Sequence, residues 1–274
     1  MSPLTFKLLG RTAPELDLSG LHPSALIGTA RRALPTLRLA LGRQQVALAD
    51  LFDISGDDCR TVRLVGLHQG CHRVGCGMTA GTLEIKGDVG NELGRELRGG
   101  SIHVSGNAGA GVGLGMRGGQ IVIGGAAGSA VGGMIPGATA GMNGGLVIIG
   151  GAAGERAGER MRRGLIVIAG AAGAHAGERM IAGTIAVLGQ CGAHVGLGMR
   201  RGTLLLAQAP PAMAPTFNDC GEFELGIVTL LQRHLATTHP ALARKFGQFS
   251  RVRRWCGDIS YGGTGEVLIA CPGT

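Results

Sequence analysis

A glycine pattern recurs every 19 residues through the middle of this chain and restricts the folds available to it. One glycine marks the start of each unit, and successive markers lie 19 residues apart, except for one spacing of 26. Further glycines follow the first six markers after six, nine and thirteen residues, so these units read GxxGxxxG. The markers are Gly81, Gly100, Gly119, Gly145, Gly164, Gly183 and Gly202. Self-similarity at a fixed period is the signature of a stacked repeat protein.

A short β-strand pattern follows each marker. Apolar residues stand two and four positions after it, as in Leu83/Ile85, Ile102/Val104, Ile121/Ile123, Val147/Ile149, Ile166/Ile168, Ile185/Val187 and Leu204/Leu206. This alternation predicts a strand with one buried face. Val62 and Leu64 indicate a frayed first rung. Strands joined by glycine corners predict an all-β chain, a right-handed β-helix (solenoid) of about seven coils.

Composition divides the chain and excludes several classes of protein. Of its 53 glycines, 40 lie in residues 61–208. We therefore expect an N-terminal segment (1–57), a β-helix domain (58–208) and a C-terminal helical cap and tail (209–274). Glycine does not recur at every third residue, which excludes collagen. An apolar content of 45% argues against disorder.

Location and partner class follow from charge, cysteine count and aromatic content. No apolar run approaches the ~18 residues of a membrane span. Seven cysteines, an odd number, without a secretion signal indicate reduced thiols in the cytoplasm. The net charge is +8, but aromatic residues make up only 3%, which disfavours nucleic acid as a partner.

One column of the repeat is rich in methionine. Met78, Met116, Met142, Met161, Met180 and Met199 share one place, and Leu97 takes it in another unit. A soft-metal site is one interpretation of such a stripe. Because leucine replaces methionine, an interior ladder that fills irregular space is the favoured interpretation.

Arginine forms a second column near the corner. Residues Arg98, Arg117, Asn143, Arg162, Ile181 and Arg200 stand two places before successive markers, and Arg163 and Arg201 follow two of them. Stacked like charges repel unless water or an anion screens them. Arginine outnumbers lysine 23 to 3, and its planar group suits carboxylates and phosphates. Two interpretations stay open: a solvated edge, or a contact with an anionic carrier or an acidic partner.

Two groups that contain histidine and cysteine are candidate metal sites. Arg156, His175 and His194 share a column beside interleaved Glu and Arg, with Cys191 close in sequence. A salt-bridged outer corner explains this column more simply. His68, Cys71, His72 and Cys76 lie within nine residues, whereas zinc ligands usually come as two separated pairs. We expect no metal on this chain.

The outward strand position is polar in the first units and apolar afterwards. Glu84 and His103 occupy it first, followed by Val122, Ile148, Val167, Ala186 and Leu205. A sheet facing water should carry polar residues there. The later units are therefore covered by the chain's own ends or by another subunit. A partner-covered face formed by Val122, Ile148, Val167 and Leu205 is the expectation.

Motifs of known catalytic chemistry are missing. The GxGxxG run at 113–118 consists of repeat glycines and is followed by a strand rather than a helix, so a dinucleotide site is rejected. No P-loop, GxSxG, HExxH or CxxC motif occurs. We therefore expect no catalytic site on this chain.

Both end segments are predicted from local patterns. Asp219-x-x-Glu222 suggests a capping box before an apolar helix with Leu225, Val228, Leu231 and Leu235, which would shield the open end of the solenoid. A second helix is expected after Pro240. In the first segment, Thr5–Leu9 and Val46–Leu51 are strand-like. Residues Leu21–Leu34 are partly helical in this prediction, with Ser19 or Ser24 as the cap.

The coils resemble a known family. They are similar to the β-helical C-terminal (GXGXG) domain of the glutamate synthase large subunit. The ending, from Gly257-Asp258 through Gly262 and Gly265 to Glu266-Val-Leu-Ile, makes the whole chain more similar to the C subunit of formylmethanofuran dehydrogenases. Within that family it most resembles the C subunit of bacterial formyltransferase/hydrolase complexes.

The resemblance implies a non-catalytic subunit in one-carbon metabolism. In such complexes a formyl group passes between tetrahydromethanopterin and a methanofuran-type carrier, and an amidohydrolase-like subunit with metal ions releases formate. The implied partners are the amidohydrolase-like A, the B and the formyltransferase D subunits. The family's carrier bears glutamates, so the arginine edge is a candidate contact for a polyglutamyl tail. The alternative is a glutamate synthase-like spacer, and an independent β-helical enzyme is disfavoured by the missing motifs.

Overall fold

The computed structural model describes residues 2–10, 15–237 and 239–271, and β-strands dominate them. A strand opens each repeat unit, which confirms the all-β class. These strands are β8 (Thr82–Gly87), β9 (Ser101–Val104), β10 (Gln120–Ile123), β11 (Asn143–Ile149), β12 (Arg163–Ile168), β13 (Thr184–Val187) and β14 (Arg201–Leu206). None of the described helices combines the length and the apolar character needed to span a lipid bilayer.

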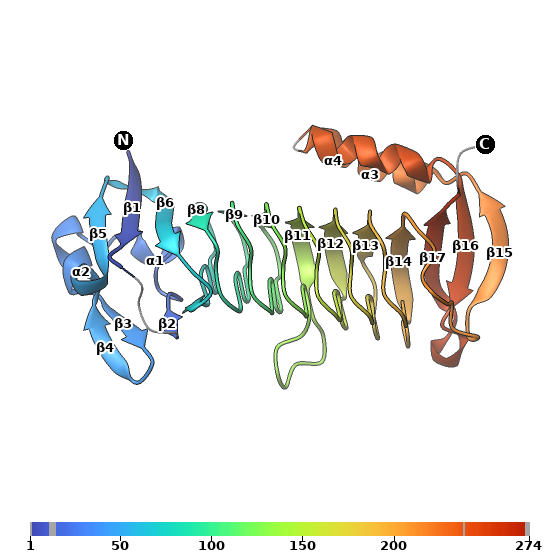
Figure 1. Ribbon diagram of the computed structural model, residues 1–274, viewed down its shortest axis with the longest axis horizontal. Coiled ribbons are helices and arrows are strands. Elements are labelled where there is room, and N and C mark those ends of the chain that lie inside the picture. Colours follow the sequence, from blue (N-terminus) through green and yellow to red (C-terminus); the bar gives the residue numbers. More distant parts are fainter. Residues whose placement is uncertain (1, 11–14, 238, 272–274) are drawn as a thin grey trace.

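Neighbouring repeat strands pair in parallel and in register (Figure 1). Ile102 of β9 pairs with Ile121 of β10, and Ile121 pairs with Val147 of β11. The register is therefore kept across the seven extra residues, which leave the stack as a loop. A second line of parallel bridges joins Val89, Ala108, Ala127, Ala153, Ala172 and Cys191. Each unit thus holds its neighbours at two places.

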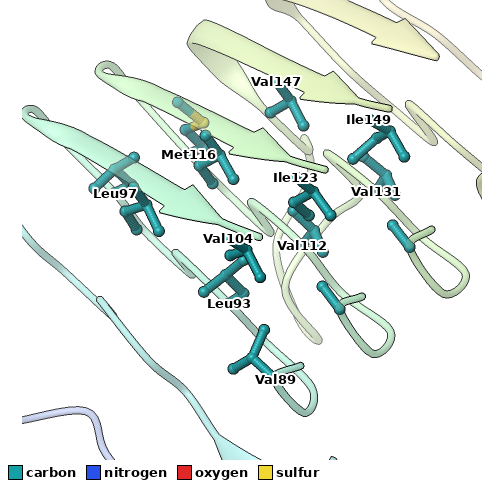
Figure 2. Close-up of a cluster of buried hydrophobic side chains, with 14 of the residues drawn as sticks. Val89, Leu93, Leu97, Val104, Val112, Met116, Ile123, Val131, Val147 and Ile149 are labelled. Carbon is teal, nitrogen blue, oxygen red and sulfur yellow. The ribbon is translucent and has the colours of Figure 1, made fainter. Parts of the chain in front are cut away.

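The space between these two lines is filled by apolar side chains (Figure 2). Figure 2 shows Val104 and Ile123 from the strands beside Leu93 and Val112, which come from the corners that precede those strands. The methionines of the repeat column are all fully buried in this core, as is Leu97. The interior-ladder interpretation is confirmed, because a residue enclosed on all sides by hydrocarbon contributes by packing.

At the N-terminal end the sheet continues beyond the glycine repeat. Strand β6 (Asp58–Leu67) is a ten-residue strand paired with β8, so the first rung expected at Val62 and Leu64 is present but is not frayed. Strand β1 (Pro3–Leu8) runs parallel to β6, and β5 (Phe52–Ser55) is antiparallel to β1. A second sheet contains β2 (Leu16–Asp17), β3 (Arg38–Leu41), β4 (Gln44–Ala47) and β7 (Cys71–His72).

Three short helices complete this end: α1 (Pro23–Leu26), η1 (Arg31–Thr36) and α2 (Leu48–Leu51). The strand predicted at Val46–Leu51 is correct only up to Ala47, after which Leu48 and Leu51 are buried as one turn of α2. Residues Leu21–Leu34 are partly helical as expected. The cap of α1 is His22 rather than a serine, because Nδ1 of His22 accepts the N–H of Ala25 at 3.3 Å.

At the C-terminal end the sheet also continues. Strand β17 (Thr264–Ala270) pairs in parallel with β14, and β16 (Val252–Gly257) and β15 (Asn218–Phe223) follow as antiparallel strands. The predicted capping box is wrong, since Asp219 and Glu222 belong to β15. Their carboxylates form ion pairs with Arg253 and Arg251. A strand with charged cross-strand partners replaces the helix start there.

Three tail helices lie along the outer face of the sheet rather than across its end (Figure 1). They are α3 (Gly226–Ala236), α4 (Pro240–Lys245) and η2 (Phe246–Phe249). The helix after Pro240 is confirmed. The expected shielding of the open end is wrong, because β17, β16 and β15 extend the sheet at that position.

The tail helices bury the apolar outer positions of the later repeat units. Phe246 and Phe249 share a buried cluster with Ile148, Val167 and Leu205, and Val122 packs against that cluster. Val167 and Leu205 have no exposed surface. The expected partner-covered face is therefore corrected: the cover belongs to this chain. The alternating pattern correctly predicted that this face is covered, but it did not identify the covering segment.

Candidate functional site

The arginines of the predicted edge lie at the same position of four repeat units, with Asn143 and Ile181 at that position in the intervening units. Four of them donate the backbone N–H to the ladder residue of the unit before. These bonds join Arg98 to Met78, Arg117 to Leu97, Arg162 to Met142 and Arg200 to Met180, at 2.8–2.9 Å. Because the acceptor occupies the same place in every unit, the arginines follow one line along the stack. The side chains of all six edge arginines are exposed.

Four of the six arginines surround one depression. Arg162, Arg163, Arg200 and Arg201 line a cavity of ≈ 630 Å³. Between the two pairs, the intervening unit presents Ile181 and Ala182 in place of arginines. These two uncharged residues separate the pairs and line the space between them. Arg98 and Arg117 do not line this cavity, so the structure gathers four of the predicted residues and leaves two apart.

None of the six arginines has a carboxylate partner within the part of the chain that the structure describes. Arginines elsewhere do, as shown by Arg63 with Glu84 at 2.8 Å and Arg254 with Glu266 at 3.0 Å. Four unpaired cations around one cavity repel one another unless water or an anion screens them. Guanidinium groups bind planar oxyanions with two hydrogen bonds, so the cavity suits carboxylates or phosphates.

A second groove adjoins the arginine cavity. It has a volume of ≈ 640 Å³ and passes beneath Leu231 and His234 of α3. The marker glycines Gly100, Gly119, Gly145 and Gly164 line it together with Ser101, Gln120 and Thr184. Gly164 lines both cavities. The edge therefore carries a long groove with mainly uncharged walls under the helix and cations at one end.

The structure does not gather the side chains of His68, Cys71, His72 and Cys76 into a set of metal ligands. Cys71 is buried in the core, and Nδ1 of His72 accepts the N–H of Asn91 at 2.9 Å. Burial raises the pKa of the Cys71 and Cys76 thiols, which disfavours thiolate ligands. Across residues 2–10, 15–237 and 239–271, no group of three His, Cys, Asp or Glu side chains is arranged to hold a metal ion.

The Arg156, His175 and His194 column is an ion-paired corner. The rings of His175 and His194 stack with centroids 4.9 Å apart. Glu178 lies 3.3 Å from His175 and 3.8 Å from Arg156. Cys191 belongs to the interior core and does not join them. The salt-bridged interpretation of this column is therefore the correct one.

Sequence reasoning missed the uncharged gap that separates the two arginine pairs, although the signal was present. Residues 161–164 and 199–202 both read MRRG, and residues 180–183 between them read MIAG. It also missed the contact that attaches the tail to the early units. The ring Nε2 of His239 lies 2.8 Å from the side-chain nitrogen of Gln120. Residues 119 positions apart give no periodic signal.

Comparison with known protein families identifies the family to which the repeat belongs. The family model described as the GXGXG motif matches residues 64–220, more than half of the chain. This chain belongs to the GXGXG family. The match begins in β6 and ends in β15, so it contains every unit of the glycine repeat and all six edge arginines. A GXGXG domain is the resemblance that the repeat units predicted.

A curated relative of this GXGXG chain is the C subunit of the formyltransferase/hydrolase complex Fhc from Methylorubrum extorquens. The two are 40% identical over 89 residues, which cover 32% of this chain and 34% of the relative. In that match the chain spans about a third of the relative's length.

A solved structure similar to this GXGXG chain comes from the same organism. It is the crystal structure of the formyltransferase/hydrolase complex FhcABCD with methylofuran. One of its chains superposes with a TM-score of 0.88 at 35% identity, covering 98% of this chain and 100% of that one. The similarity therefore includes the end segments and the tail as well as the repeat.

Proposed function

We propose that this chain is the non-catalytic C subunit of a formyltransferase/hydrolase complex in one-carbon metabolism. The observation that carries the proposal is the similarity over the full chain, with 35% identity and a TM-score of 0.88, to a chain of the FhcABCD complex. The proposed partners are the A and B subunits and the formyltransferase D. Within this complex, a formyl group would pass between tetrahydromethanopterin and a methanofuran-type carrier before release as formate.

In this proposal the repeat units wind as a right-handed β-helix of about seven coils. Two observations support it: parallel pairing at each repeat strand, and a second line of parallel bridges through Val89 and its equivalents. Crossovers between parallel strands are right-handed in about 98% of cases. The proposed division remains 1–57, 58–208 and 209–274. The sheet runs through both boundaries, so the end segments would extend one scaffold.

The scaffold role follows from what the chain offers chemically. Its core is filled by apolar side chains, and the described residues hold no cluster suited to a metal ion. In the proposal, metal ions and catalytic groups belong to another subunit, and the complex functions in the cytoplasm. This chain would contribute rigid surfaces that position its partners.

The arginine cavity is the proposed contact for an anionic carrier tail. Arg162, Arg163, Arg200 and Arg201 fit a chain of carboxylates because all four are exposed and lack acidic partners. The adjoining groove beneath α3 gives an extended chain room to continue. Arg98 and Arg117 lie along the same edge and would add a weaker, longer-range attraction.

Assembly tests the proposed function directly. The chain would be co-expressed with the A and B subunits and a tagged formyltransferase D, and the complex isolated through the tag. We expect the chain to co-elute in fixed proportion, and complexes made without it to lose other components or formyl-hydrolysing activity. The proposal is wrong if an active complex of A, B and D assembles equally well without this chain.

A charge-reversal comparison tests the arginine contact separately. Arg162→Glu with Arg200→Glu should weaken retention of the carrier by the assembled complex, with a steeper loss for longer glutamate tails. Arg32→Glu with Arg43→Glu has the same charge change at two exposed arginines away from the edge and should not. Unchanged carrier retention in the edge variant would reject the contact while leaving the assignment to the complex intact.

The glutamate synthase-like spacer is not favoured. That alternative rested on the coils alone, whereas the similarity to a chain of the FhcABCD complex covers 98% of this chain. The tail strands and helices are therefore part of the similarity.

A further inference from the structure

Two of the seven cysteines lie on neighbouring strands at the C-terminal edge of the sheet. Cys220 belongs to β15 and Cys256 to β16, and both thiols are free. The strand register pairs Asn218 directly with Cys256. Sγ of Cys220 lies 3.5 Å from the carbonyl oxygen of Asn218, the residue that pairs with Cys256. Burial, and after it the neighbouring Cys220 thiol, raises the pKa of the Cys256 thiol, so Cys256 is the slower of the two to ionise.

A bulge in β15 shapes this pair. Asp219 pairs with Trp255 and Glu222 with Arg253, so Cys220 and Gly221 together stand opposite a single residue, Arg254. The extra residue bends β15 locally and leaves it with less regular pairing. Cys220 is exposed, whereas Cys256 is half-buried. A dissolved oxidant can therefore reach Cys220 first, with Cys256 placed to react second.

The other five cysteines are less suited to oxidation to a disulfide. Cys71 and Cys191 are buried in the core, and burial raises the pKa of Cys191 to about 11. A thiol with so high a pKa is almost never a thiolate near neutral pH. Cys59, Cys76 and Cys271 are half-buried, so a dissolved oxidant reaches them less readily than it reaches the exposed Cys220.

We propose that Cys220 and Cys256 form a reversible disulfide that fastens the base of the tail helices. The oxidant is a low-molecular-weight disulfide such as oxidised glutathione. The Cys220 thiolate attacks one sulfur of that disulfide, forming a mixed disulfide and releasing one glutathione thiolate. The Cys256 thiolate then attacks Sγ of Cys220 and releases the second. Two protein thiols lose two protons and two electrons, and one oxidised glutathione becomes two reduced molecules.

The position of Cys220 and Cys256 means that a disulfide between them would enclose the tail helices in one loop. Residues 221–255, which the disulfide would enclose, contain α3, α4 and η2, the whole helical cover of the outer face. Cross-linking the ends of a segment restricts its open states. The oxidised chain should therefore hold the cover over Val167 and Leu205 more persistently than the reduced chain.

Thiol titration and peptide mapping test the pair in the full-length chain. After equilibration with oxidised glutathione, we expect the unfolded chain to titrate two thiols fewer than the seven of the reduced form. Digestion without reductant should yield one peptide pair linking Cys220 to Cys256. Cys220→Ser and Cys256→Ser should each abolish the linked peptide, and the matched Cys59→Ser variant should retain it.

Hydrogen exchange tests the consequence. Amides of 226–236 and 240–249 should exchange more slowly in the oxidised than in the reduced protein, whereas those of β9 and β10 should not change. The proposal is overturned if all seven thiols persist in the oxidised buffer, or if Cys220 is only glutathionylated. It is equally overturned if the bond joins two copies of the chain, or if exchange of the helices is unaffected by a formed disulfide.

Discussion

The buried carboxylate of Asp258 accepts a hydrogen bond from the backbone N–H of Gly198 at 3.1 Å, although the two residues are 60 positions apart. It also accepts the N–H of Ser260 at 3.0 Å, which fixes the short helix η3 (Ile259–Tyr261) against the last repeat unit. Burial alone would raise the pKa of Asp258. Hydrogen bonds from the backbone N–H groups of Gly198 and Ser260 help to outweigh burial, and the pKa is lowered.

Asp258→Ala should lower the free energy of unfolding by about 1.5–3 kcal/mol, because the buried N–H of Gly198 and the N–H of Ser260 lose a charged acceptor. Urea denaturation at neutral pH would measure it. The carboxylate stabilises the fold only while charged, since its folded pKa is below the ordinary value of 3.8. Its contribution is therefore complete above that value and is lost as pH falls through the folded pKa. Asp53→Ala, at an exposed site, is the control, and equal losses in the two variants would refute this role.

Gly189→Ala tests whether the repeat glycines are required by close packing. A Cβ at Gly189 would lie 2.6 Å from the backbone carbonyl carbon and oxygen of Gly170 in the unit before. Backbone cannot move aside as a side chain can, so we expect a loss of about 1–3 kcal/mol in the free energy of unfolding. Gly247→Ala has open space around its Cβ and should change little. Thermal and urea unfolding would distinguish them, and a stable Gly189→Ala chain would contradict steric necessity.

Phe246→Ala should loosen the helical cover of the outer face. Phe246 is fully buried and packs on Phe249 with ring centroids 5.8 Å apart. Large-to-small substitution of a buried phenylalanine costs about 3–5 kcal/mol. Exposure of Val167 and Leu205 should then increase binding of a hydrophobic dye. Leu230→Ala changes an exposed residue of α3 and should leave dye binding at the wild-type level. Similar dye binding by both variants would show that Phe246 does not hold the cover.

His22 should make stability fall at mildly acidic pH. Burial lowers its pKa below the ordinary value of 6.5, and a hydrogen bond with the Cys76 backbone opposes part of that effect. The folded chain therefore holds His22 neutral, and its contribution is complete above 6.5 and declines as pH falls below that value. The free energy of unfolding of His22→Asn, which keeps a capping side chain, should depend less on pH between about 8 and 5. An unchanged pH dependence would exclude His22 as a cause.

The sequence predicted what depends on the repeat and missed what depends on contacts between distant segments. Offsets from the marker glycines located the strands and the buried ladder, because residues at equal offsets in a stack have equal surroundings. The alternation at Ile148, Val167 and Leu205 correctly indicated a covered face. It could not name the cover, since any apolar surface would satisfy it.

A local pattern misled the prediction at the C-terminal end. Asp219 and Glu222 have capping-box spacing, yet cross-strand arginines hold them in β15. The arginine column predicted one edge, and the structure showed that Ile181 and Ala182 separate two pairs around a cavity. The grouping of the arginines into two pairs depends on which side chains between them are uncharged.

The thiol pair of Cys220 and Cys256 depends on a bulge in β15, which no periodic pattern signals.

The in-register pairing of β8 to β14 turns the number of units into a length. Each unit advances the sheet by one strand spacing of about 4.8 Å, and the seven-residue insertion leaves through a loop without changing that advance. The distance between surfaces at the two ends is therefore set in whole steps, as on a ruler. Duplicating residues 165–183 would lengthen the ruler by one step, and deleting them would shorten it by one.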